Sequence, residues 1–75
     1  MNICDVMIHI NQSLSKEART SLENSMRQVE GVISPGFNPD KEHLLVIAYN
    51  SDKTDTAALL EKAREAGYTA QLVGM

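Results

Sequence analysis

Two kinds of apolar spacing alternate along this chain, and their order limits the folds that it can adopt. Some segments place apolar residues at every second position, the period of a β-strand, and others at every third or fourth position, the period of an amphipathic α-helix. The segments follow the order strand, helix, strand, strand, helix, strand. The expected strands are 4–10, 32–37, 43–50 and 68–73, and the expected helices are 16–30 and 55–66.

Polar side chains and glycines mark the predicted helix ends. Ser15 is suited to cap the start of the first helix, because its hydroxyl can accept a hydrogen bond from a free backbone N–H group. Thr54 or Asp55 can do the same for the second helix. Gly31 and Gly67 each follow a helix and can adopt the left-handed conformation that ends it.

The strand patterns also predict how the sheet is built. Segment 43–50 is apolar on both faces, which is typical of a central strand, whereas Pro35 lacks an N–H group and confines segment 32–37 to an edge. Two right-handed crossovers then give a four-stranded antiparallel sheet in the order 4-1-3-2, with both helices on one face. We therefore expect residues 1–75 to form one domain of the α+β class, a ferredoxin-like βαββαβ sandwich.

Composition narrows the classes of function. The 75 residues carry a formal net charge of −3, and one Phe, two Tyr and no Trp offer no stacking surface for bases, so we expect no nucleic-acid partner. The longest apolar run, 44–48, is far below the roughly 20 residues that span a bilayer, so we expect no membrane insertion. The one cysteine cannot form an internal disulfide, which favours a reducing, cytoplasmic location.

Two glycine motifs resemble those of the heavy-metal-associated domain family, the copper-chaperone-like modules that also occur in metal-transporting ATPases. The motifs are Glu30-Gly31-Val32 after the first helix and Ala66-Gly67-Tyr68 after the second. The final Gly-Tyr, with Ala70 shortly after it, is the most specific part. The resemblance spans nearly the whole chain and implies the same sandwich fold.

In that family, a loop after the first strand carries a Met-Thr-Cys-x-x-Cys segment whose two thiolates bind a soft metal ion. Counting back from Gly31 by the family's spacing puts the two cysteine positions at Ser15 and Ala18. A serine hydroxyl is a hard, weak ligand and alanine has no donor atom, so the resemblance implies a degenerate metal loop and no resident cofactor. Tyr68 is the one neighbour of that site which the chain keeps, and we interpret it as closing the end of the core.

Cys4, Met1 and His9 are the remaining candidates for a metal site. A thiolate with thioethers from Met1 and Met75 would suit copper(I), if the ends of the first and last strands lie together. The competing interpretation is that Cys4 is a small buried hydrophobe. His9 has no partner at helical or turn spacing, and we interpret both it and His43 as solvated histidines.

An apolar surface is the other candidate for function. Met7, Leu44, Val46 and Ala48 are predicted to share the sheet face that the helices leave uncovered. A patch of this kind is typical of a contact surface for a protein partner or for a second copy in a homodimer. The alternative is a mildly apolar sheet that stays exposed.

We therefore expect a non-enzymatic binding module, similar to heavy-metal-associated domains, that lacks the usual cysteine pair and acts through protein contacts. One alternative is an atypical protein for binding or transfer of copper or another soft metal, with Cys4 and Met or His ligands. Another is a small-molecule regulatory domain of the ACT kind, which shares the topology. Catalysis is not expected, because no pair of activated groups is visible.

Overall fold

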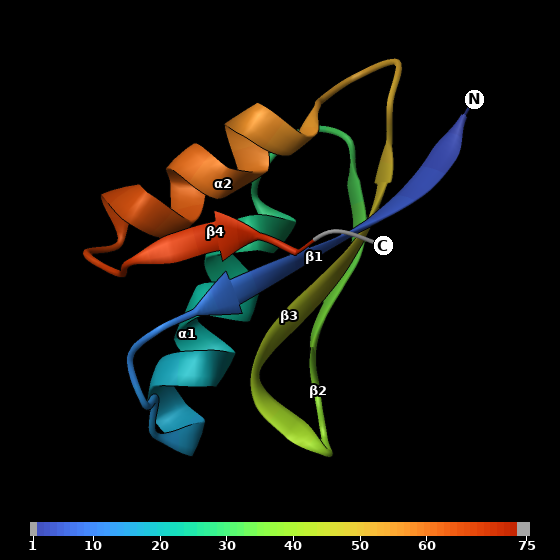
Figure 1. Ribbon diagram of the computed structural model, residues 1–75. Helices are drawn as coiled ribbons and strands as arrows, with labels where there is room; N and C mark the ends of the chain where they lie inside the picture. The colour runs from blue at the N-terminus through green and yellow to red at the C-terminus, as the bar shows by residue number, and fades with distance from the viewer. Residues whose placement is uncertain (1, 74–75) are drawn as a thin grey trace.

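The helices and strands follow one another in the predicted order (Figure 1). The structure is a computed structural model, and it describes residues 2–73. Its elements are β1 (Ile3–Ile10), α1 (Lys16–Arg27), β2 (Val32–Asn38), β3 (Lys41–Asn50), α2 (Thr56–Glu65) and β4 (Ala70–Leu72).

The strands form one antiparallel sheet in the order β2-β3-β1-β4, which is the predicted order 4-1-3-2. Figure 1 shows both helices on the same side of this sheet. β2 lies at an edge, and its Pro35 is opposite Ile47 of β3. An edge strand tolerates the missing N–H group of proline because one side of the strand has no neighbour to bond. The predicted α+β ferredoxin-like sandwich is confirmed.

Side chains alternate between the two faces of the central strands. In β1 the even-numbered residues from Val6 to Ile10 are buried, and so are their neighbours Leu45 and Ile47 in β3. Burying one such side chain stabilises the fold by roughly 1.5–3 kcal/mol relative to leaving it exposed. The core that results lies between the sheet and the helices and consists of Val6, Ile8, Ile10, Leu22, Met26, Leu45, Ile47, Tyr49, Leu59, Ala63 and Ala70.

Each helix begins at a capping side chain of the predicted kind. Ser15 Oγ accepts a hydrogen bond from the Ala18 N–H group at 3.1 Å. Asp55, rather than Thr54, caps the second helix, where its Oδ1 accepts from the Ala58 N–H group at 2.8 Å. Both caps satisfy donors that the first turn of a helix leaves without a partner.

The first helix is shorter than predicted. α1 ends at Arg27, three residues before Glu30. Beyond it the chain turns more tightly, because the N–H groups of Val29 and Val32 donate to carbonyls three residues earlier instead of four. Gly31 does have the expected positive φ, +97°, but it closes this extra turn rather than the helix itself.

The last strand is also shorter than the predicted 68–73. It begins at Ala70, because the N–H group of Thr69 donates to the side chain of Gln12 instead of to a neighbouring strand. It ends at Leu72, although the Val73 N–H group still donates to the Met7 carbonyl oxygen at 2.9 Å. The first and last strands are therefore linked as far as Met7.

Replacing Gly31 with alanine is expected to destabilise the fold more than the same change at Gly67. The two φ angles are +97° and +95°, in a region that costs a residue with a Cβ atom about 1–2 kcal/mol. A Cβ atom at Gly31 would also lie 2.7 Å from Lys53 Cβ, whereas one at Gly67 would meet nothing within 4 Å. Urea unfolding of both variants measures the difference, and equal losses of stability would contradict the prediction.

Candidate functional site

In the loop from 11 to 15, between β1 and α1, the last residue, Ser15, caps α1. Ser15 is exposed, and its hydroxyl oxygen accepts the Ala18 N–H group as described above. Ala18 is half-buried in the first turn of α1 and offers only a methyl group. The two positions at which the sequence resemblance places the cysteines thus hold a helix cap and an alkyl side chain.

Gln12 fastens the same loop to the connection between α2 and β4. Its Oε1 atom accepts the Thr69 N–H group at 2.9 Å, and its Nε2 group donates to Thr69 Oγ1 at 3.3 Å. The Asn11 N–H group adds a bond to the Thr69 carbonyl oxygen at 2.9 Å. We call this set of three hydrogen bonds the Gln12–Thr69 clasp. Sequence reasoning missed it, because the two residues are 57 positions apart and neither belongs to a periodic pattern.

Two apolar side chains connect the loop region to the core. Leu14 and Tyr68 are half-buried and pack against the core. For Tyr68 this matches the interpretation that it closes the end of the core. Polar bonds and apolar contacts together hold the loop in place.

Cys4 lies near the opposite end of β1 from this loop. It is exposed, so the expectation of a small buried hydrophobe is wrong. The reason is its position close to the start of β1, which Figure 1 shows extending away from the helices. Five residues of extended chain, about 17 Å, separate it from His9, and the two side chains point to opposite faces. They cannot bind one ion together, and Met1 and Met75 lie outside the described residues.

His9 and His43 come together at the end of the sheet next to the β1–α1 loop. Their ring centroids are 5.6 Å apart and the rings are inclined by 22°, so they stack. His9 Nδ1 lies 3.1 Å from Asn11 Oδ1, and His43 Nδ1 lies 2.8 Å from the Ile10 carbonyl oxygen. Both rings are partly exposed, as solvated histidines would be, but the sequence interpretation did not include their contact with each other.

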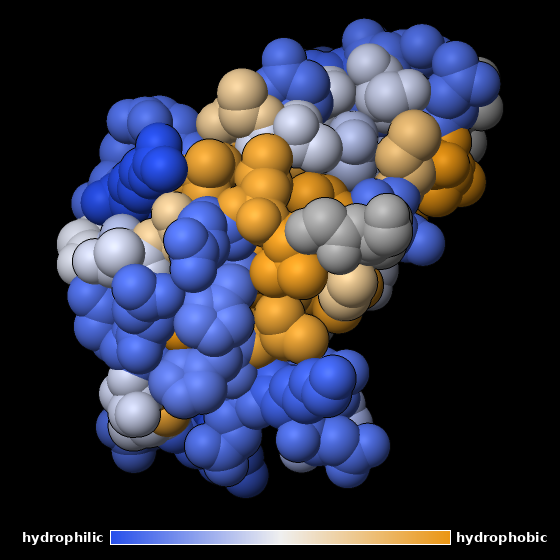
Figure 2. Space-filling model, viewed as in Figure 1, coloured by the Kyte–Doolittle hydropathy of each residue, from blue (hydrophilic) through white to orange (hydrophobic). Residues whose placement is uncertain are grey.

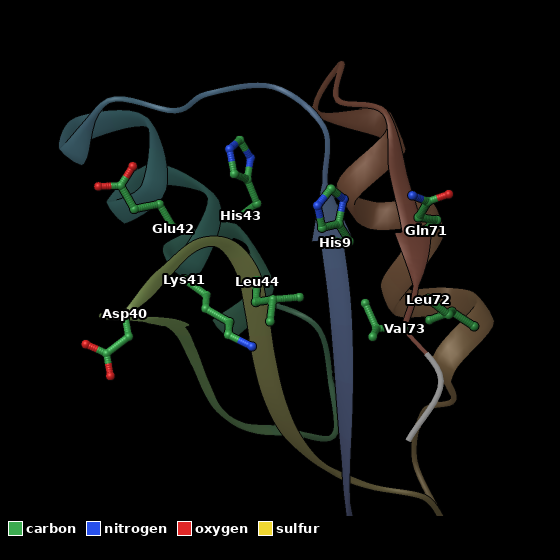
Figure 3. A pocket seen from close by; sticks show the side chains of 9 residues that line it. All are labelled: His9, Asp40, Lys41, Glu42, His43, Leu44, Gln71, Leu72 and Val73. Atoms are coloured by element: carbon green, nitrogen blue, oxygen red, sulfur yellow. The ribbon is translucent and has the colours of Figure 1, made fainter.

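A groove of about 700 Å³ runs beside the two histidines on the open face of the sheet. Figure 3 shows both rings at its end nearest the β1–α1 loop, and the Lys41 side chain beside Leu44, farther from that loop. The carboxylates of Asp40 and Glu42 point away from it in the same view. Apolar groups from β3 and from the end of the chain, Leu44 and Val73, complete its lining.

The uncovered sheet face carries the four apolar side chains predicted for it. Met7 is opposite Val46, and Leu44 and Ala48 occupy the same face of β3; all four are half-buried. We call these four residues the sheet-face patch. Figure 2 shows apolar side chains gathered over the region of β1, β3 and β4. Asp5 lies at one end of this face, opposite Ala48.

No three His, Cys, Asp or Glu side chains within residues 2–73 are close enough to hold a metal ion together. Over the same residues, no helix has the length and apolar character needed to cross a membrane.

Comparison with known proteins gives the fold its context. No family model matches the chain, and no curated protein matches it in sequence. Solved structures do match. Oxidized MerP from Ralstonia metallidurans CH34 superposes with a TM-score of 0.85 at 16% identity, over 97% of this chain and 100% of that one.

Two ATPase domains give similar values. The N-terminal domain of a potential copper-translocating P-type ATPase from Bacillus subtilis, in its Cu(I)-loaded state, has a TM-score of 0.82 at 21% identity, covering 93% of this chain and 86% of that one. The N-terminal domain of PacS from Synechocystis PCC6803 has a TM-score of 0.78 at 20% identity, over 95% and 98% of the two chains. The chain therefore has the fold of heavy-metal-associated domains.

Replacing Gln12 with alanine is expected to lower the free energy of unfolding by about 0.5–1.5 kcal/mol, because both side-chain hydrogen bonds of the clasp are lost. The Thr69 amide should then exchange faster with solvent. Ser13→Ala is the matched control, since Ser13 is an exposed residue of the same loop with no such bonds. Denaturant unfolding and amide exchange measure both effects, and similar behaviour of the two variants would refute a role for the clasp.

Proposed function

We propose that this chain is a non-enzymatic binding module of the heavy-metal-associated type that has lost the two-thiolate metal site and acts through protein contacts. The observation that carries the proposal is the state of the β1–α1 loop. Ser15 uses its hydroxyl as a helix cap, and Ala18 supplies no donor atom. A cytoplasmic location, expected from the single cysteine, belongs to the same proposal.

The clasp supports this interpretation. In a metal site of two thiolates, the ion itself links the chain segments that carry its ligands. Here the Gln12–Thr69 bonds themselves connect the loop to the α2–β4 connection. Hydrogen bonds of the chain thus supply the order that a bound ion would otherwise provide.

The sheet-face patch is the surface that we propose for contact, and a second copy of the chain is the occupant that it fits. Asp5 lies at one end of this face, and Lys41 lines the groove at the other end. Two copies packed face to face about an axis that reverses the strand direction would bring Lys41 of each copy towards Asp5 of the other. Lys41 has Asp40 and Glu42 as neighbours, but their carboxylates point away from the groove (Figure 3), so the Lys41 ammonium group is the charge placed to face the partner's Asp5 in that register.

Val46→Asp tests the contact surface. A carboxylate in the middle of the patch would be desolvated without a partner, so we expect the dissociation constant of the dimer to rise at least tenfold, about 1.4 kcal/mol. Sedimentation over a range of protein concentrations measures it. Asn24→Asp is the control, because it adds the same charge on α1. A wild-type chain that stays monomeric would reject the homodimer and leave a different protein as the occupant.

A second candidate function is binding of copper(I) at an atypical site that includes Cys4. The observation that favours it is the exposure of the thiol, which leaves the sulfur accessible to an ion. Cys4 is the one cysteine of the chain, and a single thiolate would bind weakly. The two candidates differ in whether the native chain binds copper(I) at all.

Copper(I) titration against a chelating indicator separates them. We expect the native chain and Cys4→Ser to show no stoichiometric binding, and Cys4→Ser with Ser15→Cys and Ala18→Cys to bind one equivalent, because two thiolates then flank the start of α1. Stoichiometric binding by the native chain that Cys4→Ser abolishes would support the second candidate instead. Failure of the cysteine pair to bind would contradict the view that these two positions alone account for the missing site.

A further inference from the structure

The only two histidines of the chain lie beside each other, although they come from different strands. His9 is near the end of β1, and His43 is near the start of β3. The antiparallel register puts His9 opposite Leu44, the residue after His43. Neither His9 nor His43 belongs to the core, which consists of apolar side chains. Their contact therefore has no evident role in core packing.

The hydrogen bonds of the two rings fix where their protons lie. The Ile10 carbonyl oxygen can only accept, so His43 Nδ1 must donate to it. Asn11 Oδ1 is likewise an acceptor, so His9 Nδ1 also donates. In both neutral rings the lone pair is therefore on Nε2, and neither Nε2 atom has a hydrogen-bond partner within residues 2–73.

We propose that His9 and His43 bind a divalent transition-metal ion of the borderline class, such as Zn²⁺, Cu²⁺ or Ni²⁺, through their Nε2 atoms. Imidazole nitrogen suits these ions, whereas copper(I) prefers sulfur. A histidine ligand usually donates its other ring N–H group to a carbonyl or carboxylate oxygen, which fixes the tautomer. Both rings already have that arrangement.

The separation of the rings is compatible with one shared ion. An ion about 2.1 Å from each Nε2 atom lies roughly 3.2 Å from each ring centre. The 5.6 Å between the ring centroids then corresponds to an angle at the ion of about 120°, close to the tetrahedral and trigonal values. For both Nε2 atoms to face the ion, the stacked rings must turn about their Cβ–Cγ bonds, and the Nδ1 bonds to Asn11 and Ile10 allow only a small turn.

The groove determines which other groups can reach the bound ion. It opens to solvent on the sheet face, so water can occupy the remaining coordination positions. Asp40 and Glu42 line it together with Lys41, and the two carboxylates point away from the rings (Figure 3). With two protein ligands the site would exchange its ion readily. The inference goes beyond the proposed function, because it uses neither Cys4 nor the positions of the lost cysteine pair.

Titration with Zn²⁺, followed by calorimetry and by long-range nitrogen–proton spectra of the histidine rings, tests the site. We expect one equivalent to bind, the Nε2 signals of both histidines to shift together, and binding to weaken as the pH is lowered, because protons compete for the same lone pairs. These measurements on the native chain need no variant to fold. Shifts of one histidine alone, or of neither, would overturn the proposal.

Variants separate this site from the surfaces proposed above. His9→Phe keeps an aromatic ring for stacking but removes the nitrogen, and we expect at least a tenfold loss of Zn²⁺ affinity. Cys4→Ser and Asn24→Asp should bind Zn²⁺ as the native chain does, since neither residue lines the groove. Loss of binding in Cys4→Ser, or unchanged binding in His9→Phe, would overturn the assignment without affecting the case for the sheet-face contact.

Discussion

The pairing of β1 with β3 is the constraint on which the rest of the structure depends. With Met7 opposite Val46, one set of side chains enters the core and the other set forms the open face. Because side chains alternate with a period of two, a slip of one residue would exchange the two sets. The same ladder brings His9 next to the start of β3 and so creates the histidine pair. The core, the sheet-face patch and the groove therefore all depend on the register of β1 with β3.

Much of the fold could be predicted because the spacing of apolar residues indicates which side chains face the core. Alternation in β1 and β3 correctly identified the residues that face the helices, and Pro35 correctly indicated an edge strand. The ends of elements were less predictable. Val29 continues the apolar pattern of α1, yet the chain leaves the helix at Arg27, because backbone bonds three residues apart replace the α-helical ones. The apolar pattern alone does not indicate whether a backbone N–H group will bond to the carbonyl three or four residues earlier.

The candidate site was only partly predictable, and for a different reason. That Ser15 caps a helix follows from its neighbours in the sequence, and the structure agrees. The clasp between Gln12 and Thr69 and the stacking of the histidines depend on which segments meet in space. The register of β1 with β3 places His43 close to His9, but the sequence pattern fixes only which strands are neighbours and not which residues lie opposite each other. Exposure of Cys4 likewise depends on how far β1 extends beyond the helices.

The clasp has a consequence for how this module would behave in a cell. A loop ordered by thiolates and an ion changes its shape when the ion leaves or when the sulfur is oxidised. The loop of this chain is held by an amide side chain and backbone groups, which neither a chelator nor an oxidant alters. The Gln12–Thr69 bonds that hold the loop therefore depend neither on thiolate ligands nor on the redox state of a sulfur atom.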